Sequence, residues 1–274
     1  MTLAADLFRI RDHVADFDDI VKDIKARSEA TRTDIPMVAD IAYGADPTET
    51  VDLFIPRHRR AGMPVHMFIH GGYWRMFSKR DYSYVADTIT GAGAIAVIVD
   101  YALMPVVRMV TIVDQVRRAK QWVLERIAEH GGDPERISVS GHSAGAHLST
   151  FLFNETERPS GIKAALLLGG IYDLKPLQSS FLRTEIGITD KEVDEFSPMT
   201  RRHDPSTSAM LLVGADETPP FHQQADAFMA ALSRQGLPAT RSSIAAGNHM
   251  SSVRDLGIPG SEAAAWLDKV IART

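Results

Sequence analysis

A glycine-flanked serine at positions 141–145 (G-H-S-A-G) is the group of residues most suited to chemistry in this chain. Its G-x-S-x-G spacing is typical of a nucleophilic serine on a sharp turn between a strand and a helix. The glycines let the backbone fold tightly where a Cβ atom would clash. A strand-like run, Ile137 to Ser140, precedes the serine, and small and then apolar residues, Ala144 to Phe153, follow it. This order of strand, turn and helix predicts that Ser143 is a nucleophile.

A histidine must accept the proton of Ser143, because a serine hydroxyl is a weak nucleophile near neutral pH. In enzymes with this turn, an acid and a histidine follow the serine, each on a loop after a late strand. His249 fits, because it follows the expected strand Thr240 to Ile244 and the flexible Ala246 to Asn248. The other histidines after the serine fit less well, because they lie within or before other expected elements: His147, His203 and His222. His249 is therefore the predicted base.

Two adjacent carboxylates, Asp216 and Glu217, follow the expected strand Ala209 to Val213. The side chains of neighbouring residues diverge, so only one of the two is expected to face the histidine. Glu217 is the preferred acid because it stands three positions after Gly214, and Asp216 is the alternative. If Glu217 is the acid, Asp216 is expected to hold the loop by bonding to local backbone amides.

A glycine-rich segment at 70–74 (H-G-G-Y-W) directly follows the apolar run Pro64 to Ile69. Acyl transfer places negative charge on the carbonyl oxygen, and fixed backbone amides stabilise that charge. A His-Gly-Gly loop supplies such amides together with the amide of the residue after the nucleophile. The sequence therefore predicts an oxyanion hole formed by Gly71, Gly72 and Ala144.

Four segments together resemble a known family: H-G-G-Y-W at 70–74, G-H-S-A-G-A-H-L at 141–148, E-T-P-P-F-H-Q-Q at 217–224 and N-H-M at 248–250. From about residue 64 to residue 251, the chain resembles the arylformamidase (kynurenine formamidase) group of α/β-hydrolases. The resemblance implies a cofactor-independent enzyme of tryptophan catabolism that hydrolyses an aryl formamide such as N-formylkynurenine. It also implies a catalytic triad of Ser143, Glu217 and His249, with the first motif as the oxyanion loop.

Some residues of these motifs differ from well-known members of that group, in which the acid is Asp and a polar residue precedes Phe221. The neighbouring hormone-sensitive-lipase-like esterases share the His-Gly-Gly motif and a D-P-x-R-I run like that at 133–137, but usually carry G-D-S-A-G-G. His142 and Ala146 bring this chain closer to the formamidases. A carboxylesterase for short-chain acyl esters needs the same machinery and is the alternative. A second and minor alternative is a catalytically silent hydrolase that serves as a ligand receptor.

The elements that must position these residues alternate between strands and helices. Strands are expected at 38–43, 50–55, 65–70, 94–100, 137–140, 164–168, 209–213 and 240–244, the first two forming a hairpin. Helices are expected at 81–90, 112–129, 144–153, 221–234 and 262–272. The alternation predicts an α/β fold, with a mostly parallel central sheet and helices on both faces, as in the α/β-hydrolase fold.

Two regions lie outside this alternation. Apolar residues spaced by three and four predict an amphipathic helix in the first 30 residues, either covering the sheet or acting as a lid: Leu3, Leu7, Ile10, Val14, Phe17, Val21 and Ile24. Residues 172–205 are irregular and are expected to form a cap that lines the substrate pocket. Tyr73 and Trp74 are expected either to line that pocket or to lie in the core. With no break in composition, residues 1–274 are expected to form a single domain.

Composition and charge exclude several classes of function. The chain has 274 residues, 45% hydrophobic and 24% charged, as is ordinary for a globular protein. Its net charge of −5 is spread without a basic stripe, so a small molecule is the expected partner rather than nucleic acid or a membrane. No cysteine and no H-E-x-x-H motif occur, so neither a metal nor another cofactor is expected. The charged N-terminus lacks a secretory signal pattern, so a cytoplasmic location is expected, and a homodimer is left open.

Overall fold

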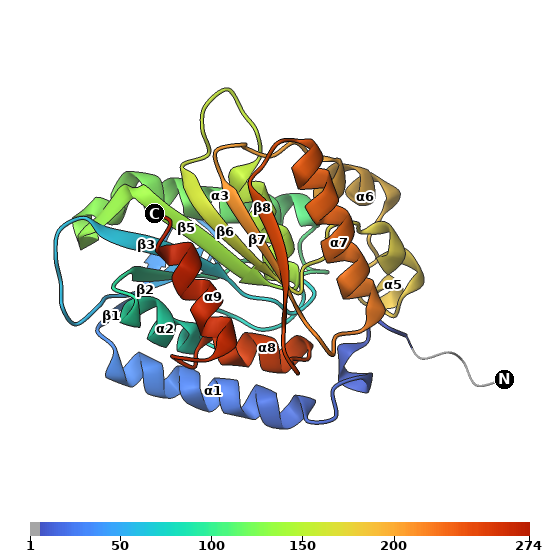
Figure 1. The fold of residues 1–274 in the computed structure, drawn as a ribbon, viewed down its shortest axis with the longest axis horizontal. Helices are drawn as coiled ribbons and strands as arrows, with labels where there is room; N and C mark the ends of the chain where they lie inside the picture. The colour runs from blue at the N-terminus through green and yellow to red at the C-terminus, as the bar shows by residue number, and fades with distance from the viewer. Residues whose placement is uncertain (1–5) are drawn as a thin grey trace.

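An eight-stranded sheet between two layers of helices forms the centre of the structure, a computed structural model that describes residues 6–274 (Figure 1). The strand order is β1-β2-β4-β3-β5-β6-β7-β8. The strands are β1 (Met37–Ala42), β2 (Thr50–Phe54), β3 (Met63–Ile69), β4 (Ile95–Val99), β5 (Gly132–His142), β6 (Ile162–Leu168), β7 (Ser208–Gly214) and β8 (Ala239–Ile244). β1 and β2 pair antiparallel, as do β2 and β4, and the other neighbours pair in parallel. The predicted hairpin and mostly parallel sheet are confirmed.

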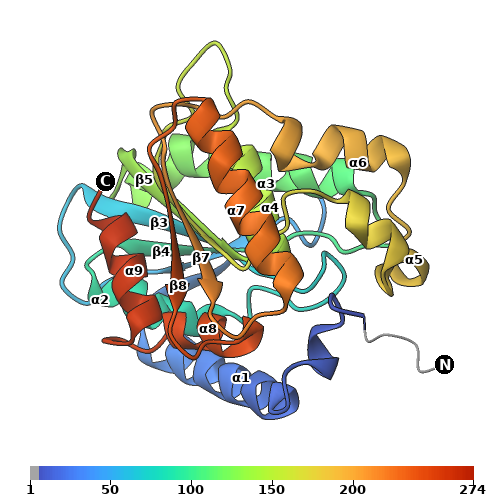
Figure 2. The same cartoon turned by 45° about the vertical axis from the view of Figure 1, so that its right-hand side comes forward.

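Helices cover both faces of this sheet, as the two ribbon views show (Figures 1 and 2). They are α1 (Phe17–Asp34), α2 (Ala86–Gly91), α3 (Met109–Arg126), α4 (Ala144–Thr150), α5 (Leu182–Glu185), α6 (Asp190–Phe196), α7 (Pro219–Arg234), α8 (His249–Leu256) and α9 (Glu262–Ile271). α2, α8 and α9 lie on one face with α1 packed against α8, and α3, α4 and α7 lie on the other. The strands therefore end between two packed layers, where their loops converge.

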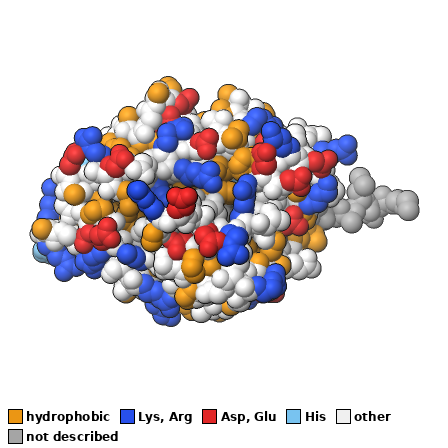
Figure 3. Space-filling view, turned by 90° about the horizontal axis from the view of Figure 1, so that it is seen from above, with side chains coloured by type: hydrophobic (Ala, Val, Ile, Leu, Met, Phe, Trp, Pro, Cys, Tyr) orange, Lys and Arg blue, Asp and Glu red, His pale blue; other side chains and the backbone are white. Residues whose placement is uncertain are grey.

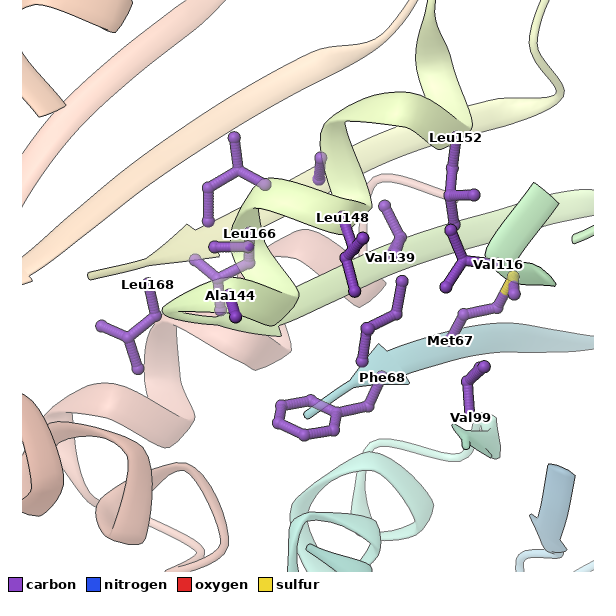
Figure 4. Packing of buried hydrophobic residues seen from close by; sticks show 14 of the residues in the cluster. Met67, Phe68, Val99, Val116, Val139, Ala144, Leu148, Leu152, Leu166 and Leu168 are labelled. Carbon is purple, nitrogen blue, oxygen red and sulfur yellow. The ribbon is translucent and has the colours of Figure 1, made fainter. Parts of the chain in front are cut away.

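The central strands are buried on both sides, and this explains their continuous apolar sequences. Every residue of β3 and of β4 is buried. In Figure 4, Ala144 and Leu148 of α4 lie against Val139 of β5 and Leu166 of β6, and all four side chains are inaccessible to solvent. Close packing of this kind makes a rigid platform for the loops that leave the strand ends.

The N-terminal helix begins later than the sequence predicts. Helix α1 runs from Phe17 to Asp34, whereas Leu7 is exposed and Leu3 lies outside the described residues. The buried face of α1 continues through Ser28 and Thr31. The Ser28 hydroxyl donates a 2.8 Å hydrogen bond to the carbonyl of Asp81, so polar groups replace apolar ones in this contact. The apolar spacing alone therefore placed the helix too close to the N-terminus.

Residues 6–16, which we call the N-terminal strap, form an irregular segment with a single 3-10 turn at Ile10–Asp12. The segment is shaped by Asp6, whose carboxylate accepts a 2.9 Å hydrogen bond from the amide of Phe8. The side chain of Phe8 is buried, and its ring lies 6.0 Å from that of Phe221 in α7. The strap therefore packs on the rest of the molecule before helix α1 begins.

The irregular segment 172–205 contains the short helices α5 and α6 and two 3-10 turns, Lys175–Ser179 and Pro198–Thr200. Thr189 caps α6 in a capping box with Glu192. The Glu192 carboxylate also pairs with Arg108, which precedes α3. These contacts join the segment to the helical layer beside it.

Charged side chains of both signs are interspersed with apolar ones on the face drawn in Figure 3. Across residues 6–274, no helix has the length and apolar character needed to cross a membrane. In the same residues, no group of three or more His, Asp or Glu side chains is arranged to hold a metal ion.

Candidate active site

Ser143 lies on the sharp turn between β5 and α4, with backbone angles of φ +55° and ψ −116°. A positive φ is strained for a residue with a side chain and persists only where the surrounding structure enforces it. Here the enforcement is close packing: a Cβ on Gly145 would stand 2.0 Å from the carbonyl oxygen of Ile69, and one on Gly141 would stand 2.3 Å from the backbone of Gly145. The two glycines thus have the spatial role that the sequence motif predicts.

Glu217 and His249 form a buried pair. His249 Nδ1 donates a 2.6 Å hydrogen bond to Glu217 Oε2, and the two residues are only 4% and 8% exposed, respectively. Glu217 Oε1 accepts a 2.9 Å bond from the amide of Gly214, so the carboxylate is fixed at both oxygens. Asp216 is exposed to solvent. Of the two adjacent carboxylates, the structure therefore brings Glu217, and not Asp216, to the histidine.

Gly169, which the sequence reasoning missed, packs against this pair. It directly follows β6 and has φ +53°. A Cβ at this position would stand 3.1 Å from Glu217 Oε1 and 3.1 Å from His249 Nδ1. The pair Gly169-Gly170 directly after an expected strand was the available signal, because a glycine at a strand end often marks a close approach of the backbone to a site.

His142, beside the predicted nucleophile, holds the backbone of His249. Its Nε2 lies 2.9 Å from the carbonyl oxygen of His249, so Nε2 carries the proton and donates it. Burial, together with the nearby His249, lowers the pKa of His142 well below its usual value of 6.5. His142 is therefore neutral at pH 7 and fixes the position of His249 without adding a charge.

The glycine-rich loop passes directly over the serine. A Cβ on Gly71 would stand 2.8 Å from the carbonyl oxygen of His142, and Gly72 has φ +107°. Within residues 6–274, the amides of Gly71, Gly72 and Tyr73 donate to no acceptor. Ala144 begins α4, where a first-turn amide has no partner within the helix. The predicted oxyanion residues thus present free amides, and the amide of Tyr73 is one that the sequence reasoning missed.

A cavity of about 180 Å³ opens beside Ser143 and His249. Its lining is mostly aromatic and apolar, with three arginines and one glutamate: Arg9, Ile10, Arg11, Phe17, Gly72, Tyr73, Arg75, Met76, Phe77, Tyr82, His142, Ser143, Phe181, Glu185, His249 and Met250. The structure records no hydrogen bond between the Ser143 hydroxyl and His249. Such bonds are often long without substrate and tighten in the reacting complex.

The two aromatic residues of the glycine-rich loop have different environments. Tyr73 lines the cavity, which is one of the two positions expected from the sequence. Trp74 does not line it and is fully buried, so its predicted place in the pocket is corrected to the core. Its indole N–H donates a 3.2 Å hydrogen bond to His147 Nδ1, and His147 Nε2 donates a 2.8 Å bond to the carbonyl of Phe196. The left-handed turn at Trp74, φ +57°, accompanies this inward orientation.

The chain is similar in sequence and in fold to several known proteins. Kynurenine formamidase from Danio rerio is 27% identical over 252 residues, which cover 87% of this chain and 85% of that protein. A probable isoprenylcysteine alpha-carbonyl methylesterase from Oryza sativa is 30% identical over 73% of this chain and 53% of its own length. The crystal structure of a putative thioesterase from Silicibacter sp. TM1040 matches with a TM-score of 0.83 at 24% identity, covering 97% of both chains. An esterase from Pyrobaculum calidifontis matches with a TM-score of 0.70 at 17% identity, covering 95% of both.

A family described as alpha/beta hydrolase fold matches residues 66–251, which is more than half of the chain. The matched segment includes Ser143, Glu217 and His249. The predicted relation to the kynurenine formamidases and esterases is confirmed, as is the predicted hydrolase class. By its matched sequence and its sheet topology, the chain belongs to the alpha/beta hydrolase family.

Proposed function

We propose that the chain is a serine hydrolase whose preferred substrate is an aryl formamide such as N-formylkynurenine. The observation that carries this proposal is the buried 2.6 Å contact between His249 and Glu217 at a cavity that also holds Ser143 on a strained turn. A carboxylate bonded to Nδ1 leaves Nε2 of the histidine as the proton acceptor that a serine needs.

In the first step, the Ser143 oxygen attacks the acyl carbonyl while His249 Nε2 takes the hydroxyl proton. The Glu217 carboxylate stabilises the imidazolium across its 2.6 Å bond. The negative charge on the carbonyl oxygen is held by the amides of Gly72 and Ala144, together with that of Gly71 or Tyr73. One such donor contributes about 3 kcal/mol to the lowering of the barrier.

In the second step, His249 returns the proton to the leaving amine, the carbon–nitrogen bond breaks, and a formyl ester of Ser143 remains. A water molecule, deprotonated by His249, attacks this ester and releases formate. The Ser143 oxygen recovers its proton from His249, so every atom and proton is accounted for without a cofactor.

Two observations support an aryl formamide as the substrate. The cavity is lined by aromatic side chains, which fit a planar leaving group: Phe17, Tyr73, Phe77, Tyr82 and Phe181. The Danio rerio and Salmo salar relatives bear the name kynurenine formamidase.

The test compares kcat/KM for N-formylkynurenine with kcat/KM for phenyl acetate. We expect the formamide to be preferred, and we expect an organophosphonate to label the wild type but not Ser143→Ala. A preference for the ester by orders of magnitude would replace the formamidase proposal. If the wild type does not react with the organophosphonate, the proposal that the chain is a serine hydrolase is wrong.

A carboxylesterase for short acyl esters is the second candidate function. The relative from Mycobacterium tuberculosis named Esterase LipQ supports it, with 32% identity over 50% of this chain. An esterase would use the same Ser143, His249 and Glu217, and would differ only in the leaving group that the aromatic wall accepts. The substrate comparison above separates the two functions.

A further inference from the structure

The N-terminal strap forms one wall of the cavity that holds Ser143 and His249. Arg9, Ile10 and Arg11 of the strap line this cavity, together with Gly72 and Tyr73 of the glycine-rich loop. In the ribbon views, the strap lies near α5 and the loop that leads into α7 (Figure 2). A substrate that reaches Ser143 therefore passes side chains that come from the first residues of the chain.

The strap is fixed in this place by three hydrogen bonds to three separate elements. The Tyr73 hydroxyl donates to the carbonyl of Phe8, and the Thr218 hydroxyl donates a 2.7 Å bond to the carbonyl of Leu7. The amide of Phe181 donates to the Asp6 carboxylate. The strap thus joins the glycine-rich loop, the loop that holds Glu217, and the segment before α5. Its side chains have defined positions relative to Ser143.

The charge on the cavity lining is unequal, with three arginines against the single carboxylate of Glu185. Two of the arginines are already paired: Arg11 donates to both oxygens of Asp18 at 2.7 and 2.6 Å, and Arg75 pairs with Glu185. Arg9 is different. Its nearest carboxylate oxygen belongs to Asp12 and lies 3.8 Å away, beyond hydrogen-bond distance. Among the residues that the structure describes, no acceptor takes a hydrogen bond from its guanidinium.

Aromatic packing orients this guanidinium. The Arg9 carbon Cζ lies 4.6 Å from the ring centre of Phe181, a cation–π distance. The Phe181 ring meets the Tyr73 ring edge to face, with centres 5.6 Å apart. A guanidinium over an aromatic ring keeps N–H groups that can still donate, and its planar fork matches the two oxygens of a carboxylate.

We propose that Arg9 is a specificity-determining residue that selects substrates whose leaving group carries a carboxylate beyond its aromatic ring. This inference rests on the proposed serine hydrolase and adds the charge of the leaving group to it. The aromatic side chains of the cavity hold the ring, and the free guanidinium of Arg9 binds the anionic end. Arg11 and Arg75 contribute less, because Asp18 and Glu185 already satisfy them.

The experiment uses two formamides that share a scissile bond and a ring, 4-(2-formamidophenyl)-4-oxobutanoate and its primary amide. The quantity measured is the ratio of their kcat/KM values in the wild type and in Arg9→Gln. We expect the wild type to prefer the carboxylate, and we expect Arg9→Gln to lower the ratio about tenfold, mainly through KM of the carboxylate. Arg9→Lys should keep part of the preference, because it keeps the charge but not the planar fork.

One control variant and one change of conditions sharpen the result. Arg234→Gln removes an exposed arginine at the end of α7 that does not line the cavity, and should leave the ratio unchanged. Added salt should lower the ratio in the wild type more than in Arg9→Gln, because it screens an exposed charge. An unchanged ratio in Arg9→Gln, or an equal loss on both substrates, overturns the inference. Labelling of Ser143 by an organophosphonate in each variant distinguishes that outcome from failure of the serine hydrolase itself.

Discussion

The two walls of the cavity are built in different ways. The catalytic wall consists of the loops after β3, β5, β7 and β8 and carries Ser143 and His249, whereas the strap wall consists of residues 6–16 and α5. On the catalytic wall, the backbone itself is constrained, with positive φ at Gly72, Tyr73 and Ser143. The strap wall is held by side-chain contacts and a few hydrogen bonds.

This difference separates the reaction from its selectivity. A strained backbone fixes amides and a nucleophile to within a fraction of an ångström, as transition-state stabilisation requires. The contact of Arg9 with Phe181 is made by the Arg9 side chain, whereas the three hydrogen bonds that hold the strap do not use that side chain. We therefore expect changes on the catalytic wall to lower kcat strongly, and changes on the strap wall to alter the choice of substrate.

The strongest test of the catalytic wall concerns its two adjacent acids. Glu217→Gln should lower kcat about 10³- to 10⁴-fold, because an amide favours the wrong tautomer of His249. Asp216→Asn is the matched control and should stay within about twofold, because Asp216 is exposed. The measurement is steady-state turnover of N-formylkynurenine. A large loss in Asp216→Asn with none in Glu217→Gln would assign the acid to the other residue.

A smaller but distinct effect is expected at Gly169. Gly169→Ala places a methyl group 3.1 Å from Glu217 Oε1 and His249 Nδ1, so it should lower kcat about 10- to 100-fold by displacing the pair. Gly236→Ala is the control, because Gly236 also has a positive φ, +82°, but open space around it. Both variants should lose about 1 kcal/mol of stability from backbone strain. Equal kcat in the two alanine variants would show that Gly169 does not position the pair.

The catalytic wall was predictable from the sequence because short-range rules govern it. Ser143, Glu217 and His249 each follow the C-terminal end of a predicted strand, in the order that the sequence motifs require. The length of β5 was harder to predict, because this strand begins at Gly132, before the apolar run that marks it in the sequence. Trp74 was ambiguous because its burial depends on a partner, His147, that is 73 residues away.

The strap wall was not predictable, because nothing local encodes it. The strap contacts Tyr73, Phe181 and Thr218 at sequence separations of 65, 175 and 211 residues. The apolar spacing instead favoured a helix over the same residues, since Ile10 and Val14 fit a helical stripe. In the structure both side chains are buried without a continuous helix between them. Tertiary contacts here outweigh the local pattern.

The smallest expected effect concerns His147, which joins Trp74 of the catalytic wall to Phe196 at the C-terminal end of α6. Burial lowers the pKa of His147 from 6.5 to about 4. The unfolded chain takes up a proton near pH 6.5 and the folded chain only near pH 4, so its contribution to stability is complete above pH 6.5 and is lost as the pH falls through this window.

From these pKa values, His147 should account for about 2 kcal/mol of the stability lost between pH 8 and pH 5. Denaturant unfolding of the wild type and of His147→Gln at both pH values measures this. The variant should be less stable at pH 8, because a buried hydrogen bond is lost, yet its stability should fall by about 2 kcal/mol less on acidification. His58→Gln, at an exposed histidine, should retain the wild-type pH dependence. An equal fall in His147→Gln and the wild type would mean that His147 is not held neutral by burial, and that the link between Trp74 and Phe196 survives acid.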